Sequence, residues 1–374
     1  MKFNVSSSLL FQQLQAVSRI VVSKNSLKIL ECVLFDLEDD SLSLTASDGE
    51  TTIRTTIKVT DAEGSGKVAF GAKLLLDTLK ELPEQPVTFV IDDQSFSLNI
   101  TTANGNYSFI GVNGNEYPQM PQIEDEHREF IIPAHTLIDA INKTIFCTAD
   151  DELRPVMNGI YFDLGTEHIT LVATDAHRLV RYTNYALKVA ENANFILPKK
   201  PANLIKNIIA KDEQDINIYF GQKNVMFEAE NTVIISRLIE GRYPNYNGVI
   251  PQNNSNSIVV DKMTLLNASR RVAVFANNGT ALLKLVINDN LINISAQDID
   301  FSTAAEETIP CSYTGMPISI GFKAPFLIEL VSAIDSDNVE LRLADAARAG
   351  LVLPTEQKEN EEVLMLLMPM LLND

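Results

Sequence analysis

The side chains that could perform catalysis are few in this chain. Asp175 and His177 lie two residues apart, and a carboxylate beside an imidazole could support acid–base chemistry. No Gly-x-Ser-x-Gly nucleophile motif accompanies them. Asp48 and Asp298 occupy the matching place in related segments without a histidine nearby. We therefore expect no active site, and an enzyme that uses Asp175 and His177 is the alternative.

Motifs for phosphate or metal binding are also weak. Gly64-Ser65-Gly66-Lys67 looks like part of a phosphate-binding loop, but the first glycine and the following Ser or Thr are missing. A hairpin turn is the better interpretation. None of the histidines has a Cys or His at metal-ligand spacing; they are His127, His135, His168 and His177. We expect neither a metal nor another cofactor.

Positive charge is concentrated in three stretches, although the net charge is −19. Residues 1–30, 198–211 and 262–278 contain no carboxylate, and apolar periodicity predicts a helix in each. Their basic residues are Lys2, Arg19, Lys24, Lys28, Lys199, Lys200, Lys206, Lys211, Lys262, Arg270 and Arg271. Such helices in an acidic protein favour sequence-independent contacts with the phosphates of a polyanion. The simpler alternative is that these lysines lie on helix faces exposed to solvent. The chain contains no Trp, so base stacking on single strands is not indicated.

The elements that carry these residues are repeated three times. Asp48, Asp175 and Asp298 end similar strand pairs and lie 127 and 123 residues apart. Pro118, Pro244 and Pro369 end later apolar strands at spacings of 126 and 125. A period of this length indicates a repeated domain, because solenoid units span about 20 to 50 residues. We expect domains at 1–125, 126–253 and 254–374, joined by polar linkers.

Each repeat is predicted to contain two helices and six to eight strands. In the first repeat, Leu10, Leu14 and Val17 have helical spacing, and a second helix is expected to begin at Ala72–Lys73. The segments between the helices are rich in Val, Ile and Thr and contain turn signals. We expect an α+β fold in which the helix pair covers antiparallel sheet.

Composition indicates a cytoplasmic protein. The three cysteines, Cys32, Cys147 and Cys311, are widely spaced and odd in number, which argues against a disulfide framework. The first residues do not form a secretory leader. The longest apolar run, residues 363–372, is about half of a bilayer span. We therefore expect no membrane partner.

Four motifs of the chain are distinctive: Arg154–Gly159, Thr174–Leu179, Gly241–Tyr246 and Met368–Leu372. Together they resemble one protein family, the bacterial DNA polymerase III β subunit, or sliding clamp, and the resemblance covers the whole chain in order. It implies a closed ring made by a head-to-tail homodimer of three-domain chains around duplex DNA. It also implies a non-catalytic processivity factor that is placed on DNA by an ATP-driven loader. The DNA-facing candidates are Lys24, Lys73, Lys199, Lys200, Lys206, Arg270, Arg271 and Lys323.

The same resemblance implies a pocket that binds short peptides of clients, among them the polymerase III catalytic subunit and other proteins with clamp-binding motifs. Its matching positions are Met157, Thr174, His177, Arg178, Leu179, Pro244, Val249, Phe326, Leu366, Leu367, Met368, Pro369, Met370 and Leu372. A methionine-rich surface can adapt to several peptides. The family usually has other residues at Ala176, Gly248 and Leu371, so client preference is left open.

The dimer contact implied by the family joins the first domain to the third domain of the partner. Leu74, Tyr107 and Phe109 would meet Val274 and Phe275, and the acidic residues Asp298, Asp300, Glu306 and Glu307 lie near that edge. A protein scaffold that never meets DNA is the remaining alternative to a clamp.

Overall fold

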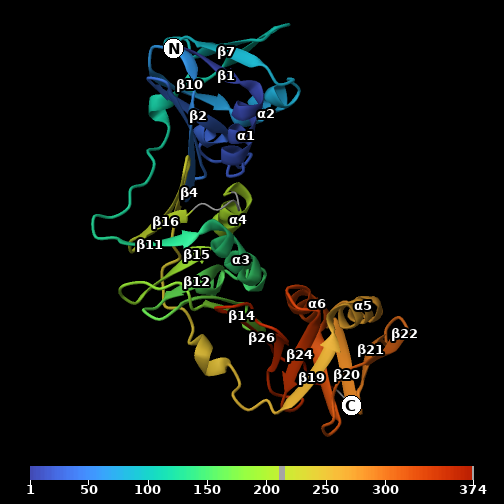
Figure 1. The fold of residues 1–374 in the computed structure, drawn as a ribbon. Coiled ribbons are helices and arrows are strands. Elements are labelled where there is room, and N and C mark those ends of the chain that lie inside the picture. The colour runs from blue at the N-terminus through green and yellow to red at the C-terminus, as the bar shows by residue number, and fades with distance from the viewer. Residues whose placement is uncertain (210–214, 373–374) are drawn as a thin grey trace. The chain divides into compact units, whose positions relative to one another are not determined.

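The same succession of helices and strands recurs three times in the computed structural model, which describes residues 1–209 and 215–372 (Figure 1). Each repeat supplies two helices, as the apolar periodicity predicts. They are α1 (Ser7–Ser18), α2 (Ala72–Lys80), α3 (Ala134–Thr144), α4 (Lys199–Ile208), α5 (Lys262–Ala273) and α6 (Ala324–Ser332). In α1 the predicted face of Leu10, Leu14 and Val17 is buried.

Helix starts follow from local capping. The hydroxyl of Ser6 accepts a hydrogen bond from the main-chain N–H of Leu9 at the start of α1. At the start of α5 the carboxylate of Asp261 accepts one from Thr264 in the same way. Such caps satisfy N–H groups that have no partner inside the helix.

The strands of the first repeat are β1 (Lys2–Ser6), β2 (Cys32–Glu38), β3 (Ser41–Ser47), β4 (Thr51–Lys58), β5 (Thr60–Glu63), β6 (Gly66–Gly71), β7 (Pro86–Ile91), β8 (Ser97–Thr101), β9 (Asn106–Ile110) and β10 (Val112–Asn113). Those of the second are β11 (Arg128–Pro133), β12 (Gly159–Leu164), β13 (Ile169–Thr174), β14 (Arg178–Asn184), β15 (Ala193–Pro198), β16 (Asp215–Phe220), β17 (Asn224–Ala229) and β18 (Thr232–Arg237). Those of the third are β19 (Asn256–Asp261), β20 (Leu282–Asn288), β21 (Leu291–Asp298), β22 (Thr303–Pro310), β23 (Ile318–Lys323), β24 (Asn338–Leu343), β25 (Gly350–Pro354) and β26 (Glu361–Leu367).

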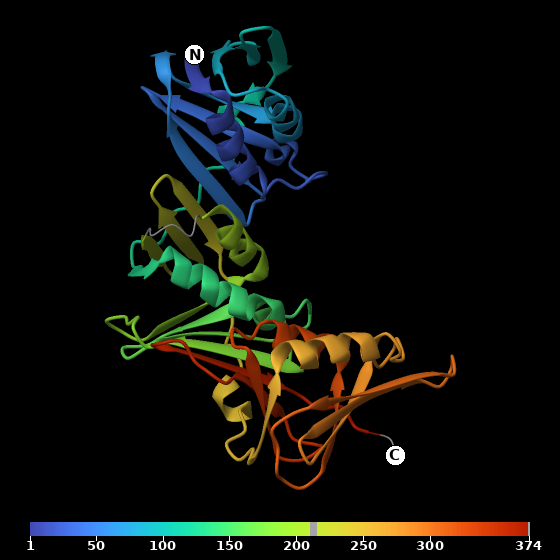
Figure 2. The ribbon, with the colours of Figure 1, turned by 45° about the vertical axis from the view of Figure 1, so that its right-hand side comes forward.

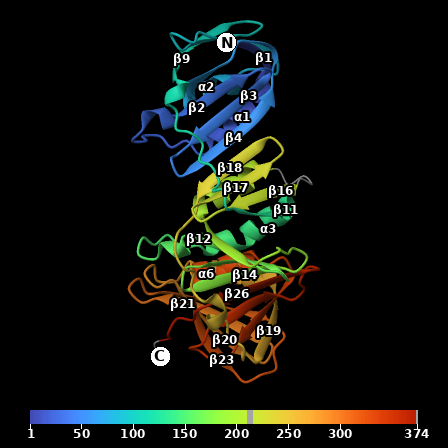
Figure 3. The ribbon, with the colours of Figure 1, turned by 90° about the vertical axis from the view of Figure 1, so that its left-hand side faces the viewer.

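Contacts group the described residues into two units, each with two antiparallel sheets. The first unit holds residues 1–138 and 200–238. Its sheets have the strand orders β5-β1-β7-β8-β9 and β10-β6-β2-β3-β4-β18-β17-β16-β11. Because β4 pairs with β18, the longer sheet continues from the first repeat into the second (Figure 3). Phe35 of the longer sheet stacks on Phe89 of the five-stranded sheet, with ring centroids 6.3 Å apart, which joins the two sheets in one core.

The second unit holds residues 139–199 and the chain from Ile239 onward. Its sheets have the orders β15-β12-β13-β14-β26-β25-β24-β19 and β22-β21-β20-β23. Here β14 pairs with β26, so the second and third repeats also share a sheet. Helices α5 and α6 pack on each other and on strands of both sheets (Figure 2).

The predicted α+β class with antiparallel sheet is confirmed. Two details differ from the sequence-based expectation. The helices α5 and α6 contact two sheets instead of one, and the first repeat has extra short strands, β5 and β10. Among the described residues, no helix has the length and apolar character needed to cross a membrane.

The segment between the first two repeats is attached to a turn. Glu124 accepts a hydrogen bond from the main-chain N–H of Lys223 at 2.9 Å, next to the β16–β17 turn. The ring of His127 contacts Tyr219 edge to face at 5.7 Å. A residue larger than glycine at Gly221 would require the Glu124 carboxylate to move, because a Cβ there would lie 2.0 Å from its oxygen.

Candidate functional site

The turn between β13 and β14 fixes the residues that suggested acid–base chemistry. One oxygen of Asp175 accepts hydrogen bonds from the main-chain N–H groups of His177 and Arg178, both at 2.9 Å. The other oxygen accepts from Nε of Arg178 at 3.1 Å. The His177 ring stacks on Phe326, with centroids 6.1 Å apart. Asp175 therefore shapes the turn, and the geometry does not support an Asp175–His177 catalytic pair.

Arg178 connects this turn with α6. Its side chain is only 8% exposed and forms an ion pair with Glu329. It also donates to the carbonyl of Phe146 at 2.8 Å, and its guanidinium lies 4.4 Å from the centre of the Phe326 ring. A planar guanidinium satisfies all of these contacts at once, which an ammonium group cannot do.

A polar cavity of about 560 Å³ opens beside this network. Its lining residues are Phe146, Thr148, Ala149, Asp150, Asp151, Arg154, Asp175, His177, Arg178, Lys199 and Glu329. Acidic and basic side chains are mixed there, and Lys199 forms an ion pair with Asp150 at 2.7 Å. Burial raises the pKa of the nearby Cys147 thiol, so this cysteine stays protonated and unreactive.

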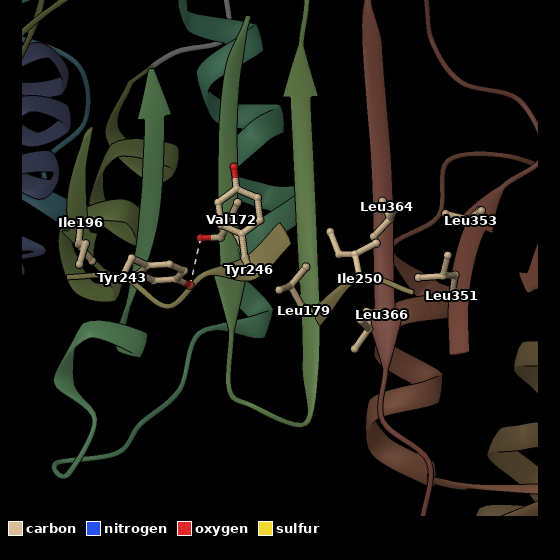
Figure 4. Packing of buried hydrophobic residues seen from close by; sticks show 10 residues of the cluster. All are labelled: Val172, Leu179, Ile196, Tyr243, Tyr246, Ile250, Leu351, Leu353, Leu364 and Leu366. Carbon is tan, nitrogen blue, oxygen red and sulfur yellow. Dashed lines mark hydrogen bonds between the residues drawn. The ribbon is translucent and has the colours of Figure 1, made fainter. Parts of the chain in front are cut away.

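An apolar cluster occupies a different region of the same unit (Figure 4). It contains Val172, Leu179, Ile196, Tyr243, Tyr246, Ile250, Leu351, Leu353, Leu364 and Leu366. The Tyr243 hydroxyl donates to the carbonyl of Val172 at 3.4 Å, and the Tyr246 hydroxyl donates to Asp163 at 2.7 Å. The two tyrosines thereby attach the connecting segment before β19 to strands β12 and β13.

The last described residues of the chain, 368–372, come directly after strand β26. The residues of β26 from Val363 to Leu367 are buried, so this run is a core strand. Beyond it, the N–H of Met368 donates to the carbonyl of His177 and that of Met370 donates to Gly321, both at 2.8 Å. Met368 and Leu371 keep exposed side chains.

The predicted pocket residues divide into two groups. Leu179 and Leu366 belong to the apolar cluster. Arg178 and His177 line the polar cavity, and Phe326 packs against both of them. Successive residues of a strand point to opposite faces, which separates Arg178 from Leu179 and Leu367 from Leu366. The remaining members are distributed over several segments. Met157 ends a 3-10 helix, and the Thr174 hydroxyl donates to the carbonyl of Arg178 in the β13–β14 turn. Pro244 and Val249 lie on the connecting segment, and Met368, Pro369, Met370 and Leu372 follow β26.

In the first repeat, the basic residues do not lie on the helix as predicted. Helix α1 contains no charged residue, while Lys2 lies in β1 and Lys24 in the segment after α1. The expectation of a basic first helix is therefore wrong. Helices α4 and α5 do carry three basic residues each and no carboxylate.

Several predicted DNA-facing residues have acidic partners. Lys200 pairs with Asp48 at 2.5 Å, and Arg271 pairs with Glu307 at 2.6 Å. Lys323 lies 4.9 Å from the centre of the Phe326 ring. Lys24, Lys73 and Arg270 are exposed, Lys206 is half-buried, and Lys211 lies outside the described residues.

The predicted dimer residues lie at sheet edges and helix ends. β9, with Tyr107 and Phe109, is an edge strand, and β22 is an edge strand of the four-stranded sheet. Leu74 on α2 is 64% exposed, and Val274 after α5 is 80% exposed. Phe275 is exposed as well.

The sequence-based prediction missed two residues near this edge. Ile299 and Phe301, in the β21–β22 turn, are 79% and 74% exposed. Asp298, expected near that edge, is buried: it accepts from Asn277 at 3.2 Å and from the N–H of Asp300 at 3.0 Å. The sequence feature that could have revealed Ile299 and Phe301 is that they alternate with Asp298 and Asp300 in one turn.

Known proteins match the chain along its whole length. Models of the DNA polymerase III beta subunit match residues 1–121 (N-terminal domain), 131–245 (central domain) and 247–371 (C-terminal domain). The beta sliding clamps of Staphylococcus aureus and Staphylococcus epidermidis are 27% and 25% identical to it over 377 residues, covering 99% of each chain.

Solved structures give the same correspondence. The DNA polymerase III subunit beta of Pseudomonas aeruginosa superimposes with a TM-score of 0.94 at 24% identity. A DnaN sliding clamp from Bartonella birtlesii bound to griselimycin gives 0.91 at 26% identity, and each comparison covers 100% of both chains. Since the three domain models follow one another in order over nearly the whole sequence, the chain belongs to the DNA polymerase III beta subunit family, the beta sliding clamps.

Proposed function

We propose that this chain is a processivity factor that encircles duplex DNA as a head-to-tail dimer. The observation that carries the proposal is the ordered match of three clamp domains over nearly the whole chain. Domains at 1–125, 126–253 and 254–374 from two copies would give a ring of six similar modules. A heterologous contact of this kind closes into a ring when the rotations add up to a full turn.

The DNA surface of the proposed ring takes residues from α4 and α5 and further lysines from the first and third repeats. The full candidate set is Lys24, Lys73, Lys199, Lys200, Lys206, Arg270, Arg271 and Lys323. Arg271 now pairs with Glu307, and both side chains are partly exposed, whereas the Asp48 partner of Lys200 is only 12% exposed. Exposed ion pairs contribute about 0 to 1 kcal/mol, so a phosphate can replace Glu307 as the partner of Arg271 at little cost. Weak, interchangeable contacts suit a ring that slides.

The client site of the proposed clamp is built around the apolar cluster and the chain end. Leu179 and Leu366 supply buried apolar surface, while Met368 and Met370 supply adaptable side chains. The partners would be the polymerase III catalytic subunit and other proteins with clamp-binding motifs. A tethered polymerase rebinds at high effective concentration, which is how a ring without catalysis raises processivity.

Opening of the ring would depend on an ATP-driven loader, because the sequence holds no nucleotide-binding motif. The protein would act in the cytoplasm without catalysing a reaction. Two alternatives make different predictions. An enzyme that uses His177 would lose turnover in His177→Ala, whereas a clamp would change only its client affinity. A scaffold that never meets DNA would tolerate charge reversal on α4 and α5.

Retention on circular DNA tests the proposal. The chain is loaded with a cognate loader and ATP onto nicked circular DNA and separated by gel filtration. We expect it to stay on the circle and to leave after a restriction enzyme linearises the DNA.

Charge-reversal variants test whether the proposed surface contacts DNA. Lys200→Glu with Arg270→Glu should reduce loading, since both phosphate-facing charges are reversed. Lys58→Glu reverses an exposed lysine on β4, outside the proposed surface, and should load normally. A chain that stays monomeric at micromolar concentration and never persists on circles would disprove the ring.

A further inference from the structure

The first linker, residues 119–127 between the first two repeats, is anchored at both ends. Just before it, the hydroxyl of the buried Tyr117 accepts a hydrogen bond from the N–H of Ser47 at 3.0 Å and donates to the carbonyl of Cys32 at 3.3 Å. Directly after it, strand β11 pairs with β16. The linker itself forms neither helix nor strand, so side chains must fix its middle part.

The side chain that does so is Glu124, whose carboxylate lies in the β16–β17 turn. Its Oε1 accepts from the main-chain N–H of Lys223 at 2.9 Å. Its other oxygen faces Gly221, where a Cβ would lie 2.0 Å from Oε2 and 2.5 Å from the carboxyl carbon. Gly221 does not have a positive φ angle, so its backbone conformation is open to other residues. The carboxylate therefore occupies the space that a side chain at position 221 would fill.

The docked carboxylate is held weakly. Its Oε2 is buried and has no hydrogen-bond partner in the part of the chain that the structure describes. A carboxylate in water accepts several hydrogen bonds, and docking exchanges them for a single protein donor. Leaving a buried oxygen unsatisfied is unfavourable, which offsets the stabilisation from the Lys223 bond. The docked and undocked positions of Glu124 therefore lie close in free energy.

Other contacts hold the end of the linker. The ring of His127 meets Tyr219 edge to face at 5.7 Å, and Arg128 is paired in register with Phe220. Neither contact uses the carboxylate of Glu124. The movement that follows its release is therefore confined to residues 119–126, and β11 stays paired.

We propose that Glu124 is a reversible clip, which exchanges the first linker between a docked and a released state. In the docked state the middle of the linker is fixed to the second repeat at the β16–β17 turn. In the released state the path from Tyr117 to β11 is slack, so the first repeat can flex against β11 while β4 and β18 remain paired. The clip involves neither DNA nor client peptides, so its test is independent of the proposed function.

Hydrogen–deuterium exchange of the whole chain, resolved at single amides by fragmentation mass spectrometry, tests whether the clip opens. The Lys223 amide reports the clip, because Glu124 is its acceptor. The Gly221 amide reports the turn itself, because it donates to the carbonyl of Asn224 at 3.0 Å. We expect the Lys223 amide to exchange about tenfold faster than the Gly221 amide. Similar rates would show that Glu124 is released only when the whole turn opens, which would overturn the proposal.

A pair of substitutions tests the contact between the carboxylate and Gly221. Gly221→Ala places a methyl group where the carboxylate lies and should speed exchange of the Lys223 amide about tenfold. In the Glu124→Ala background the same substitution should add nothing, because both changes act through one contact. Gly71→Ala is the matched control, since a Cβ there meets nothing within 4 Å, and should leave exchange unchanged. Additive effects of the two substitutions, or a Gly221→Ala variant without effect, would contradict the clip.

Discussion

At the residue scale, Ala176 is held in an unfavourable backbone conformation. Its φ angle is +74°, in the left-handed region where a Cβ costs about 1 kcal/mol. The position is fixed by the turn, since the N–H of Ala176 donates to the Thr174 hydroxyl at 3.1 Å and Asp175 holds the next two residues. Glycine adopts this conformation without strain.

Ala176→Gly should therefore raise the free energy of unfolding by about 0.5 to 1 kcal/mol. Denaturant unfolding measures the change. Ala173→Gly, in the buried strand β13, is the control and should destabilise, because glycine weakens a strand interior. A destabilised Ala176→Gly variant would mean that the methyl group makes contacts worth more than the strain.

The end of the chain supports a second residue-scale prediction. Deleting residues 370–374 removes Met370, whose N–H bonds to Gly321, and Leu372, which lies close to Gly321. We expect affinity for a polymerase-derived peptide to fall at least tenfold in fluorescence anisotropy while the oligomeric state is kept. Leu371→Ser, which alters a side chain that is 83% exposed, should bind normally. Unchanged peptide binding by the truncated chain would remove this segment from the client site.

At the element scale, Lys143 of α3 connects elements of the second and third repeats. Its side chain is 9% exposed and lies 3.0 Å from Glu361 and 3.4 Å from Asp335. It also lies 5.2 Å from the centre of the Tyr182 ring. Burial acts to raise the pKa of Asp335, but the hydrogen bond from Lys358 and the charge of Lys143 lower it below its ordinary 3.8.

This lowered pKa predicts how stability depends on pH. A carboxyl group with a depressed folded-state pKa stabilises the protein above its ordinary pKa, and the effect is lost as pH falls through the folded value. Asp335→Asn should therefore lower Tm at pH 7, and the difference from the parent should close as pH falls below about 3.8. Glu63→Gln, which breaks the exposed pair with Lys2, should change Tm little at either pH. A Tm difference for Asp335→Asn that persists at pH 2 would contradict the ionic explanation.

At the scale of the whole molecule, the free strand edges favour self-association. β9 and β22 end their sheets, and unpaired edges readily join another chain. Val274, Phe275, Ile299 and Phe301 are exposed close to the β22 edge in the fold of the third repeat. A contact between these residues and Leu74, Tyr107 and Phe109 of a second copy would cover both groups.

Val274→Ser with Phe301→Ser should therefore shift a dimer toward monomer at micromolar concentration, as measured by sedimentation velocity. Truncating buried apolar side chains at an interface costs about 1 to 2 kcal/mol each, enough for a tenfold or larger loss of affinity. Met316→Ser, an exposed residue in the connection before β23, is the control. If the double variant stays dimeric, these residues lie outside the contact.

The sequence by itself determined the repeats, the helix pairs and the family. Periodic apolar residues such as Leu10, Leu14 and Val17 specify a helix locally. A motif such as Gly241–Tyr246 can be recognised from the sequence alone. The aromatic residues of that motif were available as a signal, although their attachment to β12 and β13 was not predicted.

Only the tertiary structure decided how the site residues are partnered. Lys200 and Asp48 are 152 positions apart, and Arg178 and Glu329 are 151 apart. Their pairing depends on sheets shared between repeats, which no local pattern specifies. The placement of Leu179 beside Leu366 in the apolar cluster likewise required the register of β14 with β26. Local propensity acts over a few residues, whereas charge pairing and cavity walls arise from long-range packing.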